Sequence, residues 1–326
     1  MCPTLPRFGG TRYRPLRPIP DPAFGDVPAP GVGDGRVLAF LIVRDSVLKL
    51  ADGRDLALVE LGAGSDPPVM YFHGVPTSRL DLVSRESEIR AARARVIAVD
   101  RPGFGGSSPQ PWRHLNDWAR DVDALADHLA LDRFAVLGLS AGGAFATASA
   151  TLLPNRVGAL GLVAAVSDPA WEGSRARETS EEEALYATDD EDAVRAWHEE
   201  RFGADGSGYL AGATELPAPD AAVFDDPVHG PALLGSVSES FRQGVGGMAQ
   251  DRLVRSRPWT FDPASVDVPT AILHGEQDTV VTIENGEHNM TLLPTARLTR
   301  FPEHGHISIM SEIPKLAGDL ATALGS

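Results

Sequence analysis

The 326-residue sequence contains a single cysteine, Cys2, directly after the first methionine. A lone cysteine cannot form a disulfide within the chain, and its position gives no reason to expect thiol catalysis. The cysteine content therefore gives no indication of an oxidising compartment.

Long apolar segments are missing from the early part of the chain. The longest apolar run there, Val37–Val43, is far shorter than the ~20 residues that a helix needs to span a bilayer. The arginines of the first twenty residues alternate with prolines, and no signal-type apolar stretch follows them. The sequence therefore predicts no membrane segment and, by default, a cytoplasmic location.

Basic residues are also in short supply. The chain has 29 Lys and Arg against 45 Asp and Glu, which gives a formal net charge of −16 at pH 7. A negative charge of this size opposes binding to nucleic-acid phosphates and to anionic membrane surfaces. Neither nucleic acid nor a membrane is therefore expected as a partner. The sequence leaves a homodimer open.

The length and the hydrophobic content of 43% are sufficient for a large buried core. Residues 1–36 are rich in Pro, Gly and Arg without a helical or strand period, which predicts a flexible N-terminal arm. After the arm, short apolar segments between turn residues predict eight strands. These are Val43–Leu50, Leu56–Leu61, Val69–Phe72, Val96–Val99, Phe134–Leu139, Leu160–Ala164, Ala271–Leu273 and Arg297–Phe301.

Several of these segments are nearly continuous apolar runs, such as Phe134–Leu139. Such runs are typical of parallel strands that are buried on both faces. Helical patterns over 115–129 and 141–153 lie between the strands. This alternation predicts an α/β fold with a doubly wound, mostly parallel eight-stranded sheet.

The alternation of strands and helices stops between about Asp168 and Trp259. Helical patterns cover Ser180–Phe202 and Ser236–Val254, with a Pro/Gly/Asp-rich segment between them. We therefore predict a core formed by residues 37–167 and 257–326, and a helical cap insertion formed by residues 168–256. The cap should lie over the carboxyl edge of the sheet, where open α/β folds bind ligands.

The predicted strand that ends at Leu139 runs directly into Gly138-Leu139-Ser140-Ala141-Gly142 and then into a helix. This strand–turn–helix context is the one that a nucleophile elbow requires. A serine on such a turn has strained backbone geometry, and its hydroxyl projects into the cleft. Ser140 is therefore the predicted nucleophile, in preference to a small-residue turn that only packs the helix onto the sheet.

A serine hydroxyl needs a general base, because it is a weak nucleophile at neutral pH. His304 and His306 both follow the last predicted strand, at the sheet edge where Ser140 is expected. His306 is the preferred base, and His304 is its competitor.

A carboxylate that orients the base should follow a strand and lie between the serine and the histidine in the chain. Asp278, in Leu273-His274-Gly275-Glu276-Gln277-Asp278, meets both conditions. Glu276 and Asp168 are the alternatives, although turn formation and helix capping explain both of them better.

An oxyanion that develops on the substrate needs two backbone N–H donors. Ala141, the residue after the nucleophile, supplies the first. The second should come from the loop Phe72-His73-Gly74-Val75-Pro76. Pro76 has no N–H, so Val75 is the predicted donor.

Five motifs occur in a fixed order along the chain. They are His73-Gly74-Val75-Pro76, Asp100-Arg101-Pro102-Gly103-Phe104-Gly105-Gly106-Ser107, the segment around Ser140, Gly275-Glu276-Gln277-Asp278 and Gly305-His306. In these motifs the chain resembles the α/β-hydrolase fold superfamily, of the kind that carries a cap, over about residues 45–322. The resemblance favours His306 over His304 and implies that the 100–107 loop is a tight structural turn. Thr282 departs from the pattern, because many relatives have a proline there.

The identity of the nucleophile narrows the expected reaction. Relatives that open epoxides or remove halides have an aspartate at the elbow, so Ser140 argues against both activities. We expect a serine hydrolase that acts through an acyl-enzyme, on carboxylic esters of small to medium size, without a cofactor or a metal. The alternatives are carbon–carbon bond or amide hydrolysis, a cofactor-free haloperoxidase-type activity, and a non-hydrolytic biosynthetic or binding member of the fold.

Overall fold

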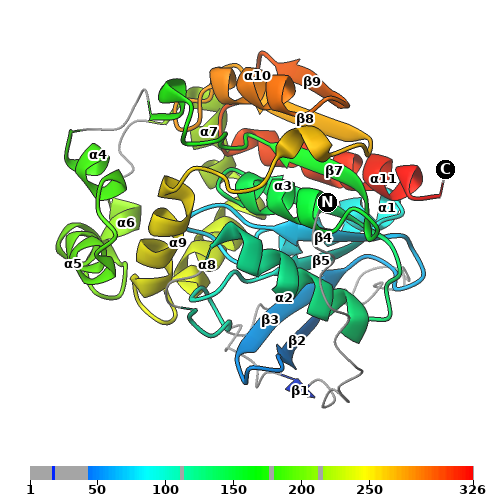
Figure 1. Cartoon of the computed structure of the whole chain (residues 1–326), viewed down its shortest axis with the longest axis horizontal. Helices are drawn as coiled ribbons and strands as arrows, with labels where there is room; N and C mark the ends of the chain where they lie inside the picture. The colour runs from blue at the N-terminus through cyan, green and yellow to red at the C-terminus, as the bar shows by residue number, and fades with distance from the viewer. Residues whose placement is uncertain (1–16, 19–42, 111–113, 176–179, 212–215, 326) are drawn as a thin grey trace, which may run out of the picture.

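Short apolar segments assemble into one mixed sheet with helices on both faces (Figure 1). The computed structural model describes residues 17–18, 43–110, 114–175, 180–211 and 216–325. The strands are β1 (Arg17–Pro18), β2 (Arg44–Lys49), β3 (Asp55–Leu61), β4 (Pro68–Phe72), β5 (Arg95–Val99), β6 (Phe134–Leu139), β7 (Val157–Val163), β8 (Thr270–Gly275) and β9 (Ala296–Phe301).

The strand order is β1-β2-β3-β5-β4-β6-β7-β8-β9. The pairs from β1 to β5 are antiparallel, and those from β5 through β4 to β9 are parallel. The eight predicted strands correspond to β2–β9, which confirms the mostly parallel α/β sheet. Every residue of β6 and β7 is buried, as their continuous apolar sequences indicate.

The structure adds a short ninth strand at the edge of the sheet. In β1, Arg17 pairs with Val47 and Pro18 with Ser46 of β2. The other residues of the predicted arm (residues 1–36) lie outside the described residues, so the flexible arm stays a prediction.

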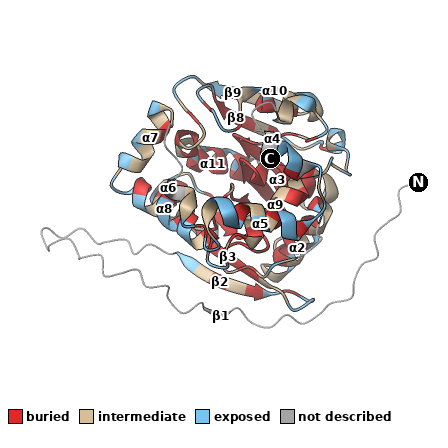
Figure 2. Cartoon of the chain, turned by 90° about the vertical axis from the view of Figure 1, so that its left-hand side faces the viewer, coloured by how far each residue is buried: buried red, intermediate tan, exposed pale blue. Residues whose placement is uncertain are grey.

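Two groups of helices cover the two faces of the sheet. The helices α2 (Leu115–His128), α3 (Gly142–Leu152) and α10 (Ile283–Leu292) pack on one face, and α1 (Glu86–Ala91) and α11 (Ile313–Ala323) on the other. Figure 1 shows α2 and α3 in front of the central strands. Each face buries its own apolar cluster, and the outer sides of the helices remain exposed (Figure 2).

The connection between β7 and β8 carries the helices of the predicted cap. They are α4 (Ser180–Tyr186), α5 (Glu191–Phe202), α6 (Gly208–Ala211), α7 (Ala218–Asp225), α8 (His229–Ser240) and α9 (Gly246–Ser256). Short 3-10 turns occur at η1 (Val83–Arg85), η2 (Glu172–Arg175), η3 (Pro263–Ser265) and η4 (Ser308–Glu312). No strand occurs among the described residues of this connection.

The predicted helix boundaries inside the cap are wrong in two places. The pattern over 180–202 is divided into α4 and α5, because Asp190 caps a new helix by accepting hydrogen bonds from the N–H groups of Asp192 and Ala193. The pattern over 236–254 is divided into α8 and α9, and Gly244 between them has a φ of +79°. The Pro/Gly/Asp-rich segment between the two patterns contains a further helix, α7.

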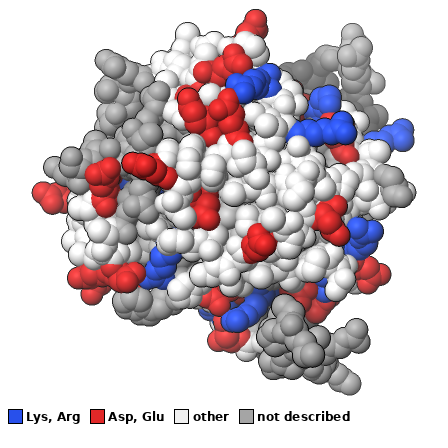
Figure 3. Space-filling model, turned by 45° about the horizontal axis from the view of Figure 1, so that its top comes forward, with Lys and Arg blue, Asp and Glu red and all other residues white. Residues whose placement is uncertain are grey.

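Figure 3 shows one face of the molecule, where acidic side chains are spread among wide uncharged areas. This appearance agrees with the net charge of −16. Among the helices that the structure describes, none combines the length and the apolar character needed to cross a bilayer.

A buried arginine joins three parts of the fold. The guanidinium of Arg79 is fully buried and contacts Asp100 at 2.7 Å, Asp45 at 2.8 Å and Glu239 at 2.7 Å. Asp100 also accepts hydrogen bonds from the N–H groups of Arg79 and Gly106. The carboxylate therefore organises the 100–107 loop as the tight structural turn that the resemblance implies.

Replacing Arg79 should strongly destabilise the protein. In Arg79→Met the buried Asp100 loses its positive partner, and removing one member of a buried pair costs about 3–5 kcal/mol. The free energy of unfolding in urea measures the effect. The control is Arg120→Met, because the Arg120 side chain is 77% exposed beside Asp117 and such a change should cost less than about 1 kcal/mol. Equal losses in the two variants would contradict the prediction.

Candidate active site

Ser140 lies on a sharp turn between β6 and α3. Its backbone φ is +52°, a left-handed conformation that is costly for a residue with a side chain. Its N–H is held by the carbonyl of Val163 at 2.9 Å. A Cβ atom on Gly142 would lie 2.1 Å from the carbonyl oxygen of Phe72, so only glycine permits this close approach of the turn to β4. The predicted elbow geometry is therefore present at Ser140.

The structure brings His306 and Asp278 to Ser140 from two other loops. His306 Nε2 is 3.0 Å from Ser140 Oγ, and His306 Nδ1 is 2.7 Å from Asp278 Oδ2. Because the Asp278 carboxylate accepts a hydrogen bond from Nδ1–H, the neutral imidazole carries its proton on Nδ1. Its Nε2 is then free of a proton and can accept a hydrogen bond from the serine hydroxyl. The three side chains form one hydrogen-bonded chain across loops that follow β6, β8 and β9.

The contact between Asp278 and His306 favours the charged form of both groups, so it lowers the pKa of Asp278 and raises that of His306. Burial opposes the ionisation of Asp278, but the charge of His306 and the imidazole of His274 hold its pKa well below the ordinary value. Burial also lowers the pKa of His306, but the charge and hydrogen bond of Asp278 and the charge of Asp220 outweigh it, so that this pKa is raised. The Asp278 carboxylate is further fixed by the N–H groups of Val280 and Val281, each at 2.8 Å.

The alternative residues occupy other positions. His304 Nε2 lies 3.7 Å from Glu312 Oε1 and not beside Ser140. Glu276 is exposed. Asp168 accepts hydrogen bonds from the N–H groups of Ala170 and Trp259, which is the turn-forming role expected of it.

A cavity of about 180 Å³ adjoins Ser140. Val75 and Ala141, the predicted oxyanion donors, both line it beside the serine. Arg255 of α9 also lines it, so the end of the predicted cap contributes to the cavity. The two residues predicted to bind the oxyanion therefore both belong to the cavity wall next to Ser140.

Arg101 supports the loop that carries Val75. Its guanidinium donates to the carbonyl oxygens of His73 and Gly74, and its backbone N–H donates to His73 Nε2 at 3.0 Å. The same guanidinium pairs with Asp251 of α9 through two contacts of 3.1 Å, and both side chains are fully buried. A cap carboxylate thus fixes the arginine that holds this loop.

Asp220 is a fully buried carboxylate near the predicted base, and no pattern in the sequence pointed to it. Asp220 lies in the first turn of α7 and accepts hydrogen bonds from the N–H groups of His306, Ile307 and Ser308. Its position after two prolines would suggest only an acidic residue at a helix start. The sequence signal therefore could not reveal a contact across 86 residues.

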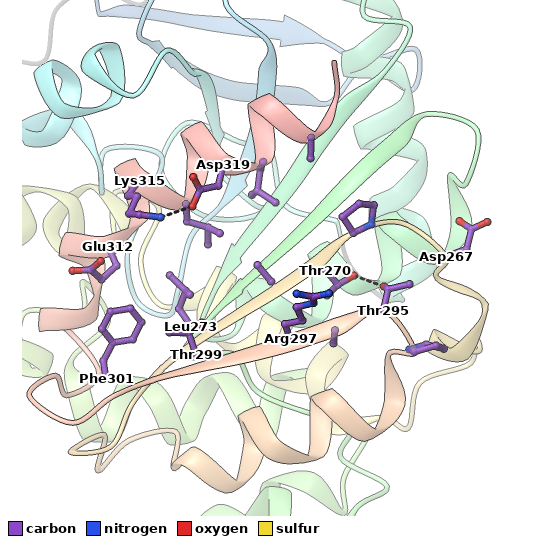
Figure 4. A pocket seen from close by; sticks show the side chains of 17 residues that line it. Asp267, Thr270, Leu273, Thr295, Arg297, Thr299, Phe301, Glu312, Lys315 and Asp319 are labelled. Carbon is purple, nitrogen blue, oxygen red and sulfur yellow. Dashed lines mark hydrogen bonds and ion pairs between the residues drawn. The ribbon is translucent and has the colours of Figure 1, made fainter. Parts of the chain in front are cut away.

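The described residues offer little else that resembles a binding site for a cofactor or metal. Among them, no group of three or more His, Cys, Asp or Glu side chains is placed to hold a metal ion. A second cavity of about 950 Å³ lies between α11 and the strands β8 and β9, where Lys315 pairs with Asp319 (Figure 4). Neither Ser140 nor His306 lines this cavity.

Comparison with known proteins identifies the family. The sequence model of the alpha/beta hydrolase fold family matches residues 67–193, which include Ser140 and the turn around it. Over 86% of this chain and 98% of the other, the structure superimposes on a thermophilic esterase from Thermogutta terrifontis with a TM-score of 0.65 and 23% identity. The chain belongs to the α/β-hydrolase fold superfamily.

Curated relatives of this α/β hydrolase carry several names. A non-heme haloperoxidase from Rhodococcus erythropolis is 29% identical over 78% of this chain and 90% of its own length. A bifunctional esterase/perhydrolase from Acinetobacter calcoaceticus is 26% identical over 84% of this chain and 98% of its own length. These names support the prediction of a hydrolase and leave its substrate open.

The activity of this α/β hydrolase should fall in acid. His306 can accept a proton from Ser140 only when it is neutral, and its pKa is raised above the ordinary 6.5. A raised pKa keeps the imidazole protonated to higher pH, so kcat/KM should decline as the pH falls through a midpoint above 6.5. A pH-stat measurement with 4-nitrophenyl acetate gives this midpoint. A midpoint below the ordinary histidine value would contradict the effect of the two carboxylates.

Proposed function

We propose that this protein is a serine hydrolase that forms an acyl-enzyme on Ser140 and acts on carboxylic esters of small to medium size. The observation that carries the proposal is the continuous hydrogen-bonded chain from Asp278 through His306 to Ser140, with distances of 2.7 and 3.0 Å. A nucleophile, a base and an orienting carboxylate in this geometry suit acyl transfer.

Each residue has a defined part in the proposed reaction. Ser140 Oγ attacks the ester carbonyl while His306 Nε2 takes its proton, and Asp278 stabilises the imidazolium that forms. The N–H groups of Val75 and Ala141 stabilise the oxyanion. The imidazolium then protonates the leaving alcohol, and a water activated by His306 releases the acid from Ser140.

The cavity size supports the range of substrates. A volume of about 180 Å³ lies below the roughly 300–1,000 Å³ of a typical ligand pocket. Such a space holds a small acyl group beside Ser140, and a larger group would have to extend toward the cap. The expected small-molecule substrate fits this proposal, while the cytoplasmic location stays a prediction and a homodimer stays open.

Removing the nucleophile should abolish hydrolysis without unfolding the protein. In Ser140→Ala the strained turn keeps its backbone and loses only a hydroxyl, and loss of a triad serine ordinarily lowers kcat by several powers of ten. Wild-type protein should also be labelled at Ser140 by a fluorophosphonate, as detected by mass spectrometry. A folded Ser140→Ala protein that retains a tenth of the wild-type kcat would refute the assignment, and an unlabelled wild type would favour a non-hydrolytic member of the fold.

The two neighbouring histidines provide a matched pair. His306→Ala should lower kcat to about the level of Ser140→Ala, because the two residues act as one unit. His304→Ala should retain most of the activity, since that imidazole faces Glu312. The kcat values for 4-nitrophenyl acetate decide between the two histidines, and the reverse result would assign the base to His304.

The names of the relatives suggest a second candidate function. The proposed acyl-enzyme could react with hydrogen peroxide in place of water, which would release a peracid and regenerate Ser140. The Acinetobacter relative is named a perhydrolase and the Rhodococcus relative a haloperoxidase. Peracid formation from an acetate ester and added peroxide tests this candidate, and Ser140→Ala is its control. Ester hydrolysis without any peracid would leave only the hydrolase.

A further inference from the structure

A carboxylate of the cap is in direct contact with the loop that carries the proposed base. Asp220 Oδ2 accepts from the N–H of His306 at 2.9 Å. Its Oδ1 accepts from the N–H of Ile307 at 3.0 Å, and from the N–H and the hydroxyl of Ser308 at 2.8 Å each. Three consecutive backbone N–H groups, beginning with that of His306, therefore converge on one carboxylate.

The local sequence permits this close approach. A Cβ atom on Gly305 would lie 2.5 Å from Asp220 Oδ2, so any larger residue would displace the carboxylate. The hydroxyl of Ser308 also accepts from the N–H of Gly305 at 2.8 Å, so it joins the loop to the carboxylate from both sides. The contact is thus shaped by the residues on either side of His306.

Packing of α7 delivers the carboxylate to this position. The helix α7 contacts η4, and its residues Val223 and Phe224 pack against the apolar cluster that contains Ile309 and Met310 of η4. Asp220 itself is fully buried. Because buried polar groups are costly unless they are hydrogen-bonded, the carboxylate and the three N–H groups satisfy one another only when α7 is docked.

We propose that Asp220 is a positioning residue for the base His306, and that docking of the cap helix α7 on η4 completes the catalytic geometry. This inference rests on the proposed function, in which His306 activates Ser140. Asp220 fixes the backbone from which the imidazole extends, whereas Asp278 fixes the imidazole ring itself.

Asp220 also acts on the charge of His306. The groups that face His306 are Asp278 from the β8–α10 loop, Ser140 from the elbow and Asp220 from α7, and His274 lies behind Asp278. On its own loop, His304 is turned toward Glu312. The charge of Asp220 adds to that of Asp278 in raising the pKa of His306. Removing the Asp220 charge should therefore move the acid limb of kcat/KM to lower pH.

The test compares Asp220→Asn with a matched control, Asp226→Asn. Asp226 is also an aspartate of the cap and accepts from two backbone N–H groups, those of Val228 and His229, but it lies outside the His306 loop. With 4-nitrophenyl acetate, kcat of Asp220→Asn should fall by roughly 10²-fold, because a small displacement of a catalytic group has an effect of that size. KM should change little, and the midpoint of the acid limb should decrease. Asp226→Asn should match the wild type.

A milder variant keeps the test decisive if Asp220→Asn does not fold. Ser308→Ala removes the hydrogen bond to Asp220 and the one from the N–H of Gly305 but retains the Asp220 charge, so kcat should fall several-fold without a shift of the acid limb. A folded Asp220→Asn with wild-type kcat and an unchanged acid limb would overturn the inference, as would a fully active Ser308→Ala if Asp220→Asn does not fold. Failure of the proposed function is recognised separately, because wild-type protein would then hydrolyse no ester and Ser140 would not be labelled by a fluorophosphonate.

Discussion

Burial of the central strands on both faces is the constraint from which the rest of the structure follows. Every residue of β6 and β7 is buried, so these strands have no room for an unpaired charge. Polar residues accordingly occupy the loops at the carboxyl ends of the parallel strands. Ser140 follows β6, Asp278 follows β8 and His306 follows β9. Residues that are 166 and 28 positions apart in the chain therefore meet within hydrogen-bond distance.

The cap completes this arrangement through two buried carboxylates. Asp251 of α9 pairs with Arg101, which holds the loop of Val75 on one side of the cavity. Asp220 of α7 accepts from the N–H of His306, in the loop that carries the proposed base. The predicted cap is thus bonded, through Arg101, to the loop of Val75 and, directly, to the loop of His306.

The sequence was most informative where the signal is local. The eight strands follow from short apolar runs, and the elbow follows from a strand, a serine between glycines and a helix. His306 and Asp278 both follow predicted strands, which predicted them at the sheet edge where Ser140 lies. The preference for His306 over His304 also depended on the resemblance to a family. Each of these inferences depends on neighbouring residues in the chain.

Contacts between distant segments could not be predicted in the same way. Asp220 and Asp251 are acidic residues in helical segments, and such residues are usually solvated. Their burial depends on partners 86 and 150 positions away, which no local pattern specifies. The predicted helix boundaries in the cap were wrong for a related reason. An apolar period does not show that Asp190 begins a new helix or that Gly244 has a left-handed backbone conformation.

The contact between Asp220 and the His306 loop bears on how new enzymes could be built from this scaffold. Caps are attractive units for exchange between related proteins, since they cover the cavity and are connected to the core by only two crossings of the chain. In this protein such an exchange would also replace the residue that accepts from the N–H groups of His306, Ile307 and Ser308. A chimera would therefore need an aspartate at the equivalent of Asp220, on a helix of matching register, for a transplanted specificity to be accompanied by a working base.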